Sequence, residues 1–273
     1  MQVEDAAIAT YGSERATQFV DASFDTRMVK LFHDRLDQAP ESFRPELHRA
    51  GLFDLFFHPT ILDIVAHIVG TEELRLYPNF TSRPKVPGRS KDQVRWHQDA
   101  GYTVSSEFVG SGATNAETTA VRVGNYSLAD VDYMAASMVN VWTSLVPVGR
   151  NEGCMQFSAG SHHLGLLPHA KPPPDDPWLR LPEEVIASYC SEESGRLVDV
   201  DTQPGDIVLF HQYLIHGSQL PNLSGKLRWA LDFRFQNADV ETLRNTQGHL
   251  ARSVRQPDSV VKDAEEWASL TLS

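Results

Sequence analysis

One ten-residue stretch, LRWALDFRFQ at residues 227–236, decides the fold class of this 273-residue chain. Every second side chain in it is large and apolar, namely Leu227, Trp229, Leu231, Phe233 and Phe235. The alternate side chains are polar or small, namely Arg228, Ala230, Asp232, Arg234 and Gln236. Because successive side chains of a β-strand point to opposite faces, this period of two predicts a strand with one face in the core.

The rest of the chain places this strand in a larger β-structure. We expect further strands at residues 74–83, 94–99, 138–146, 154–157 and 207–210. The N-terminal part instead shows helical spacing, with Met28, Phe32 and Leu36 on one stripe within residues 26–39. Pro59 and Gly70 suit the first turn and the end of a second helix.

Helices first and short strands afterwards predict one mainly β domain, a barrel or sandwich with an N-terminal helical flank. The expected parts are the flank at 1–70, the β core at 71–236 and a C-terminal tail at 237–273. The long Gly-, Ser- and Thr-rich stretch at 103–136 is a candidate substrate-covering lid, because loops of this length are usually functional or disordered. Within or beside it, apolar substrate contacts are expected from Tyr102, Phe108 and Tyr126.

Charge and cysteine content narrow the possible partners. Lys and Arg number 24 against 36 Asp and Glu, so the formal charge is −12, which disfavours nucleic acid and anionic membrane surfaces as partners. Two cysteines do not make a disulfide framework in a chain of this length. The acidic N-terminus does not resemble a signal peptide, and no apolar run reaches a membrane span, so we expect a soluble, cytoplasmic protein.

His97-Gln98-Asp99 is the stretch that indicates chemistry. On a strand, His97 and Asp99 point to the same face while Gln98 points away, so an imidazole and a carboxylate can meet at one metal ion. His216, which follows a predicted buried strand, is the candidate third ligand. Two histidines and one carboxylate leave open positions on the metal, the arrangement of non-haem iron(II) oxygenases.

Together with these ligands, other motifs resemble the phytanoyl-CoA dioxygenase family over roughly residues 58–236. The matching residues are Trp96 to Tyr102, Trp142, Asn151 to Met155, Gly160 to His162, Pro204 to Asp206, His216 to Ser218, Asn222, Ser224 and Arg228. The resemblance implies a double-stranded β-helix (a jelly-roll or cupin-like barrel), iron(II) as the metal, and 2-oxoglutarate and O2 as cosubstrates. It also implies oxidation of a small organic molecule, coupled to decarboxylation of 2-oxoglutarate to succinate and CO2.

The distal carboxylate of such a cosubstrate needs a cation. Arg228 is the candidate, because a guanidinium can grip a carboxylate with two parallel hydrogen bonds, and Arg234 is the alternative. Ser218 can add a hydroxyl hydrogen bond, and Trp142 matches a position that lines the cosubstrate pocket in the family. Three residues on one strand face are expected to point into the barrel: Asn79, Thr81 and Arg83.

The reaction and two other functions stay open at this point. Because related halogenases have a small residue where Asp99 stands, we expect hydroxylation, desaturation or ring closure and not halogenation. A zinc-dependent hydrolase can use the same ligand types, although no HExxH helix is present. A non-catalytic jelly-roll binding module is the second alternative. A basic peptide as substrate also remains compatible with the acidic charge.

Overall fold

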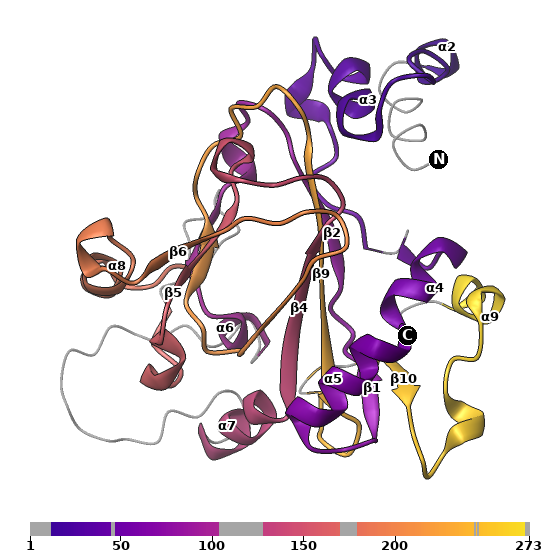
Figure 1. The fold of residues 1–273 in the computed structure, drawn as a ribbon, viewed down its shortest axis with the longest axis vertical. Helices are drawn as coiled ribbons and strands as arrows, with labels where there is room; N and C mark the ends of the chain where they lie inside the picture. The colour runs from indigo at the N-terminus through magenta and orange to yellow at the C-terminus, as the bar shows by residue number, and fades with distance from the viewer. Residues whose placement is uncertain are drawn as a thin grey trace.

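Two antiparallel β-sheets face each other in the computed structural model, which describes residues 12–44, 47–103, 128–169, 179–242, 244 and 246–270 (Figure 1). The larger sheet has the order β10 (His249–Arg252), β1 (Leu74–Leu76), β9 (Arg228–Asn237), β4 (Met138–Ser144) and β7 (Ile207–Phe210), and β2 (Thr81–Lys85) also pairs with β9. The smaller sheet has the order β3 (Val94–His97), β8 (His216–Ser218), β5 (Met155–Ser158) and β6 (Leu197–Val200). The predicted mainly β fold is thus confirmed, and two facing sheets agree with a double-stranded β-helix.

The alternating stretch forms β9, the central strand of the larger sheet. Its register with β2 places Lys85 opposite Arg228, and its register with β4 places Trp142 opposite Asp232. The apolar side chains of β9 belong to the main hydrophobic core, whereas its arginines and aspartate line a cavity between the sheets. The alternation of side chains therefore places the apolar residues of β9 in the core and its charged residues at the cavity, although both faces of the strand are buried.

Helices cover the face of the larger sheet that points away from the cavity (Figure 1). They are α4 (Ala50–Phe56), α5 (Pro59–Val69) and α9 (Ala264–Ser269). As predicted, α5 begins with Pro59 at its first turn and ends at Gly70, which adopts the left-handed conformation with φ 77°. Among the described residues no single helix is long and apolar enough to span a membrane, although α4 and α5 together, bent by 41°, satisfy length and composition. The cytoplasmic location stays a prediction.

The N-terminal helices are shorter than the predicted stripe. The structure has α2 (Ser13–Ala16), α3 (Phe24–Leu31) and the 3-10 turn η1 (Leu36–Gln38) in this region. Met28 and Phe32 are buried as expected, but α3 ends at Leu31 and Leu36 falls in the separate turn. The polar run after Phe32 has no apolar face to bury, so the helix has no packing that would extend it.

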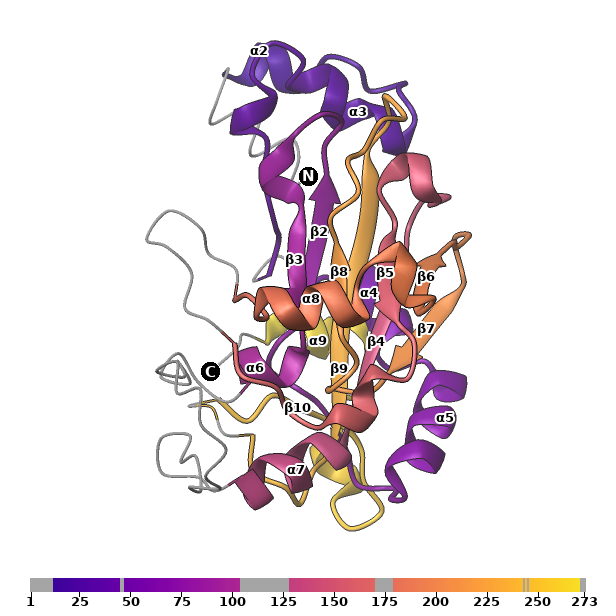
Figure 2. The same ribbon diagram turned by 90° about the vertical axis from the view of Figure 1, so that its left-hand side faces the viewer.

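Helix α8 (Glu183–Tyr189) lies across the outer face of the smaller sheet (Figure 2). It packs on a separate apolar cluster that includes Trp96 and Ile215, the neighbours of two predicted metal ligands. The remaining helical elements are short: η3 (Ser90–Asp92), α6 (Asp99–Thr103), α7 (Leu128–Ala136), η4 (Arg150–Glu152), η5 (Ser161–Leu164), η6 (Glu192–Ser194) and η7 (Pro257–Ser259).

Two of the predicted parts contain regular structure among the described residues. The segment expected as a tail supplies β10, an outer strand of the larger sheet, and α9, whose Trp267 is fully buried. In the segment expected as a lid, α7 carries Met134, which belongs to one apolar cluster with Tyr77. Residues 104–127 of that segment, with Phe108 and Tyr126, lie outside the described residues.

Candidate metal centre

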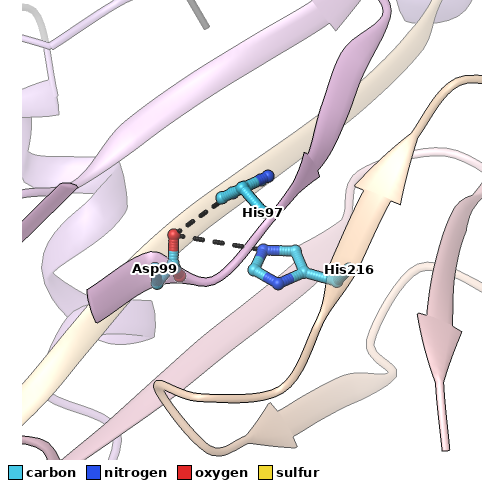
Figure 3. A group of neighbouring side chains, drawn as sticks. All are labelled: His97, Asp99 and His216. Atoms are coloured by element: carbon cyan, nitrogen blue, oxygen red, sulfur yellow. Dashed lines mark ion pairs between the residues drawn. The ribbon is translucent and has the colours of Figure 1, made fainter. Parts of the chain in front are cut away.

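His97, Asp99 and His216 meet between the two sheets (Figure 3). One ligand atom from each lies within 4.8 Å of the others, and all three residues are buried. His97 ends β3 and lies directly opposite His216, which begins β8. We had predicted that Asp99 lies on the same strand as His97, but β3 ends at His97 and Asp99 is the first residue of α6. In α6 the Ala100 amide donates to the carbonyl of Gln212.

The two histidines present the same ring nitrogen to the carboxylate. Nδ1 of His97 lies 2.7 Å from the Arg95 carbonyl, and Nδ1 of His216 lies 2.9 Å from the Leu214 carbonyl. These contacts place the proton on Nδ1 and leave Nε2 as a lone-pair donor, since a carbonyl can only accept. The Nε2 atoms lie 3.5 Å (His97) and 4.0 Å (His216) from Oδ1 of Asp99.

The electrostatic surroundings of His216 and Asp99 favour the protonation states that a metal requires. Burial and the neighbouring His97 lower the pKa of His216 to about 4, so its imidazole is neutral at pH 7. Burial alone would raise the pKa of Asp99, but Arg234 and the two histidines hold it well below its usual range. Two imidazoles and a carboxylate are a fitting donor set for a divalent transition metal.

Gln98, between the two ligands, points away from them as expected and anchors the turn. Its side-chain amide donates to the carbonyls of Gly165 and Tyr213, each at 2.8 Å, and its carbonyl accepts from the Leu167 amide at 2.7 Å. The backbone amide of Gln98 donates to Nε2 of His169 at 3.0 Å. Burial and His97 lower the pKa of His169 to about 4, which keeps this nitrogen an acceptor. The turn that carries His97 and Asp99 is therefore held in place by the hydrogen bonds of Gln98.

A cavity of about 430 Å³ opens beside the three ligands. Its described lining includes the ligands and Asn79, Arg83, Tyr102, Trp142, Phe210, Ser218, Arg228, Asp232 and Arg234. This volume lies within the usual range for small-molecule sites. Residues from both sheets form it, so the metal group faces a space that can hold a small molecule.

Arg228 is a buried cation in this wall. It donates through Nη1 to Ser218 Oγ at 2.8 Å and to the Gly153 carbonyl at 3.0 Å, and its Nε has no hydrogen-bond partner among the described residues. Burial lowers its pKa to about 10. Its guanidinium carbon lies 5.8 Å from the ring centre of Trp142. A buried cation with an unpaired donor fits an anionic ligand.

Lys85 lies next to Arg228 and was not predicted. Only 2% of Lys85 is exposed, and its Nζ donates to the oxygens of Ser218 at 2.7 and 2.9 Å and to the Leu220 carbonyl at 2.5 Å. Burial and the Arg228 charge lower its pKa to about 6. The Lys85 amine and the Arg228 guanidinium thus share the Ser218 hydroxyl, and the acceptors that they contact there are neutral.

Of the other residues predicted for the site, Arg234 and Asn79 line the cavity and Thr81 does not. Arg234, the alternative anchor, is bound to Asp99 instead, with Nη2 2.7 Å from Oδ2. Asn79 lines the cavity and accepts from Arg234 Nη1 through its backbone carbonyl at 3.0 Å. Thr81 is fully buried, is not part of the described cavity lining, and has no partner for Oγ1 among the described residues.

The sequence analysis did not identify four residues at or near the site: Lys85, His169, Arg44 and Arg244. Of these, Arg44 and Arg244 line the cavity. Lys85 had an available signal, because residues 81, 83 and 85 share one face of a strand and two of these were singled out. The other three lie on irregular segments, where no periodicity tells the direction of a side chain.

The chain matches known proteins over most of its length. The family model described as phytanoyl-CoA dioxygenase (PhyH) matches residues 14–230. A probable phytanoyl-CoA dioxygenase of Caenorhabditis elegans is 25% identical over 203 residues, which cover 72% of this chain and 54% of the relative. The peroxisomal phytanoyl-CoA dioxygenase of Homo sapiens is 33% identical over 181 residues, covering 66% and 44%. The chain thus spans about half the length of these curated relatives.

A solved structure supports the fold. The apo form of the non-heme monooxygenase ThoJ superimposes with a TM-score of 0.52 at 20% sequence identity. The match covers 93% of this chain and 76% of that one. At this identity the likeness concerns the architecture of the two facing sheets.

Proposed function

Since the chain belongs to the phytanoyl-CoA dioxygenase family, we propose that it is an iron(II)- and 2-oxoglutarate-dependent dioxygenase that oxidises a small organic molecule. One observation carries this proposal. The cavity holds two histidines and a carboxylate near one another and, in its wall, the buried cation Arg228, whose Nε has no hydrogen-bond partner among the described residues. A redox metal and a dicarboxylate cosubstrate would use these two features together.

His97, Asp99 and His216 would hold the iron. All three come from β3, β8 and α6 and line the cavity, so a metal that they hold would be accessible to a small molecule there. When bound, iron(II) supplies the redox chemistry that couples decarboxylation of 2-oxoglutarate by O2 to oxidation of a substrate C–H bond, giving succinate and CO2. The protein would contribute the ligands and the cavity beside them.

Arg228, Ser218 and Lys85 would hold the distal carboxylate of 2-oxoglutarate. The Arg228 guanidinium offers its unpaired Nε, and the Ser218 hydroxyl already joins Arg228 to Lys85. An anion there offsets the desolvation of Arg228 and favours the protonated, charged form of Lys85. Trp142 would cover this end of the cosubstrate, since it lines the cavity and lies against Arg228.

Asp99 bears on the type of reaction. With a metal bound, its carboxylate would be a ligand at a position that could otherwise accept a halide, so we propose hydroxylation, desaturation or ring closure. Product analysis with chloride present checks this, and a chlorinated product would contradict it.

The direct test is cosubstrate turnover. Protein loaded with iron(II) under air should convert 2-oxoglutarate to succinate, even slowly in the absence of substrate, whereas the matched His216→Ala protein should not. A folded wild-type protein that forms no succinate but hydrolyses ester or amide probes with zinc bound would favour the zinc hydrolase. Binding of small molecules without any turnover would favour the binding module.

A further inference from the structure

Three buried side-chain amides lie near Arg234 and outside the described lining of the cavity: Asn140, Gln212 and Gln236. Asn140 is 2% exposed, and the two glutamines are fully buried. Burial of an amide is unfavourable unless its donors and acceptors find partners. Apolar side chains of the same size would avoid this cost, so the three amides indicate a role beyond packing.

Strand register places two of these amides beside Arg234. Asn140 on β4 is directly opposite Arg234 on β9, and the two side chains share one face of the larger sheet. Cross-strand partners of this kind have Cβ atoms about 4.5–5.5 Å apart. Gln236 follows Arg234 by two residues on β9 and therefore lies on the same face. The side chain that contacts Asp99 thus has an amide neighbour on its own strand and another on the adjacent strand.

Gln212 connects Asn140 to the segment that carries Asp99. Its Nε2 donates to Oδ1 of Asn140, and its backbone carbonyl accepts from the Ala100 amide at 3.2 Å. Ala100 directly follows Asp99 in the chain. A path of hydrogen bonds therefore runs from β4 through Gln212 to the residue next to the proposed metal ligand.

Four buried polar atoms in this group have no hydrogen-bond partner among the described residues. Two are donors, Nδ2 of Asn140 and Nε of Arg234, and two are acceptors, Oε1 of Gln212 and Oε1 of Gln236. The two donors belong to neighbouring side chains but cannot bond to each other. A water molecule accepts two hydrogen bonds and donates two, so a single buried water can serve all four atoms.

We infer that the three amides bind a buried water molecule against Nε of Arg234 and so keep its guanidinium on Asp99. This inference rests on the proposed function, because Asp99 acts in it as a metal ligand. Nη1 of Arg234 donates to the Asn79 carbonyl at 3.0 Å, and Nη2 lies 2.7 Å from Oδ2 of Asp99. With the water at Nε, all three nitrogens are held, and the carboxylate is oriented before a metal arrives. The amides are positioning residues that act on the metal through Arg234.

The first test removes the two linked amides together. Asn140→Leu/Gln212→Met replaces both partners of one hydrogen bond by apolar side chains of similar size, which is nearly neutral for the stability of a fold. Cobalt(II) affinity, measured in competition with a chelator, should fall about tenfold or more. Gln236→Met, which removes one acceptor and leaves the other two amides paired, should also weaken it. Wild-type affinity in these variants would overturn the inference.

Thr143→Val is the matched control. Thr143 is also buried and polar on β4, but it lies on the opposite face from Asn140 and donates to the Asp206 carbonyl at 2.8 Å. Its substitution should leave cobalt(II) affinity unchanged. An equal loss of affinity in Thr143→Val would overturn the inference, because the effect would then come from any buried polar change in this strand.

A double-mutant cycle shows whether the amides act through Arg234. In the Arg234→Gln background, Asn140→Leu/Gln212→Met should cause little further loss of cobalt(II) affinity, since its effect passes through the missing guanidinium. Additive losses would overturn the inference, because the amides would then support the ligands by another route.

Deuteron relaxation dispersion on the metal-free protein tests the water molecule itself, because it counts waters with long residence times. Asn140→Leu/Gln212→Met should hold one fewer such water than the wild type, and Thr143→Val should hold the same number. An unchanged count in the amide variant would overturn the inference. The count needs no metal, so it decides the inference even if the wild type binds no cobalt(II), a result that counts against the proposed function.

Discussion

Arg234 contacts only one of the two carboxylate oxygens of Asp99, and the other oxygen faces the two histidines. Its Nη2 lies 2.7 Å from Oδ2, while Oδ1 faces Nε2 of His97 at 3.5 Å and Nε2 of His216 at 4.0 Å. One oxygen is therefore held by a cation and the other is presented toward the histidines. This arrangement favours Asp99 as a ligand through a single oxygen and fixes its orientation before a metal arrives.

Arg234→Gln should weaken metal binding about 10- to 100-fold, the usual cost of losing a partner that orients a ligand. Competition between the protein and a chelator for cobalt(II) measures the affinity. Arg252→Gln is the matched control, because Arg252 pairs with Asp63 and Glu72 on the surface. Unchanged metal affinity in Arg234→Gln would show that Asp99 needs no such support.

Arg228→Gln should weaken 2-oxoglutarate binding about 10- to 150-fold, since a buried charge-assisted hydrogen bond contributes about 1.5–3 kcal/mol. Metal affinity should stay as in the wild type. Arg228→Lys should fall between the two, because it keeps the charge but loses the planar fork. Calorimetry on manganese(II)-loaded protein gives both constants, and wild-type 2-oxoglutarate affinity in Arg228→Gln would place the anchor elsewhere.

Binding of 2-oxoglutarate should take up a proton at Lys85. With a pKa of about 6, Lys85 is mostly neutral at pH 8, and an anion arriving next to Ser218 raises this pKa by favouring the charged form. The raised pKa draws a proton from the buffer. Calorimetry at pH 8 in buffers of different ionisation enthalpy should show uptake of up to about one proton, lost in Lys85→Met. Equal uptake in Lys85→Met would contradict this assignment.

The same residue gives the stability of the ligand-free protein a pH dependence. Between pH 6 and 10.5 the unfolded chain protonates Lys85 while the folded protein does not, so the unfolded state binds more protons. Unfolding free energy should therefore rise with pH across this window. The rise should be smaller in Lys85→Met.

Trp267→Ala should destabilise the protein by about 3–5 kcal/mol, because it empties a fully buried site between α9 and the core. It also removes the hydrogen bond from Nε1 to the Leu47 carbonyl at 3.1 Å. Leu223→Ala, at a side chain that is 73% exposed, should change stability by less than about 0.5 kcal/mol. Denaturant unfolding measures both, and a small effect of Trp267→Ala would mean that the C-terminal segment is dispensable for folding.

The parts that were predictable from the sequence are those with local periodicity or a local motif. The alternation in LRWALDFRFQ separates the core face of β9 from its cavity face, and the spacing of His97 and Asp99 places both near His216. Pro59 and Gly70 mark the ends of α5 because their backbone preferences act within one turn.

The elements and site contacts that the sequence did not predict depend on packing between segments that are distant in the chain. Strand β10 and helix α9 have weak local patterns and owe their place to the edge of the larger sheet and to Trp267. The assignment of Arg234 to Asp99 and of Arg228 to the Ser218 end needs the register between strands, which side-chain spacing does not reveal. Arg44 and Arg244 line the cavity from irregular segments that lie 200 residues apart in the sequence.

The most direct test of the central claim is an anaerobic titration of the metal-free protein with iron(II) and then 2-oxoglutarate, followed by visible absorption. Our account predicts a weak metal-to-ligand charge-transfer band in the wild type. The band should be absent in His97→Ala, and in Arg228→Gln it should require more 2-oxoglutarate. A folded wild-type protein that binds zinc tightly but shows no band with iron(II) and 2-oxoglutarate would contradict the account.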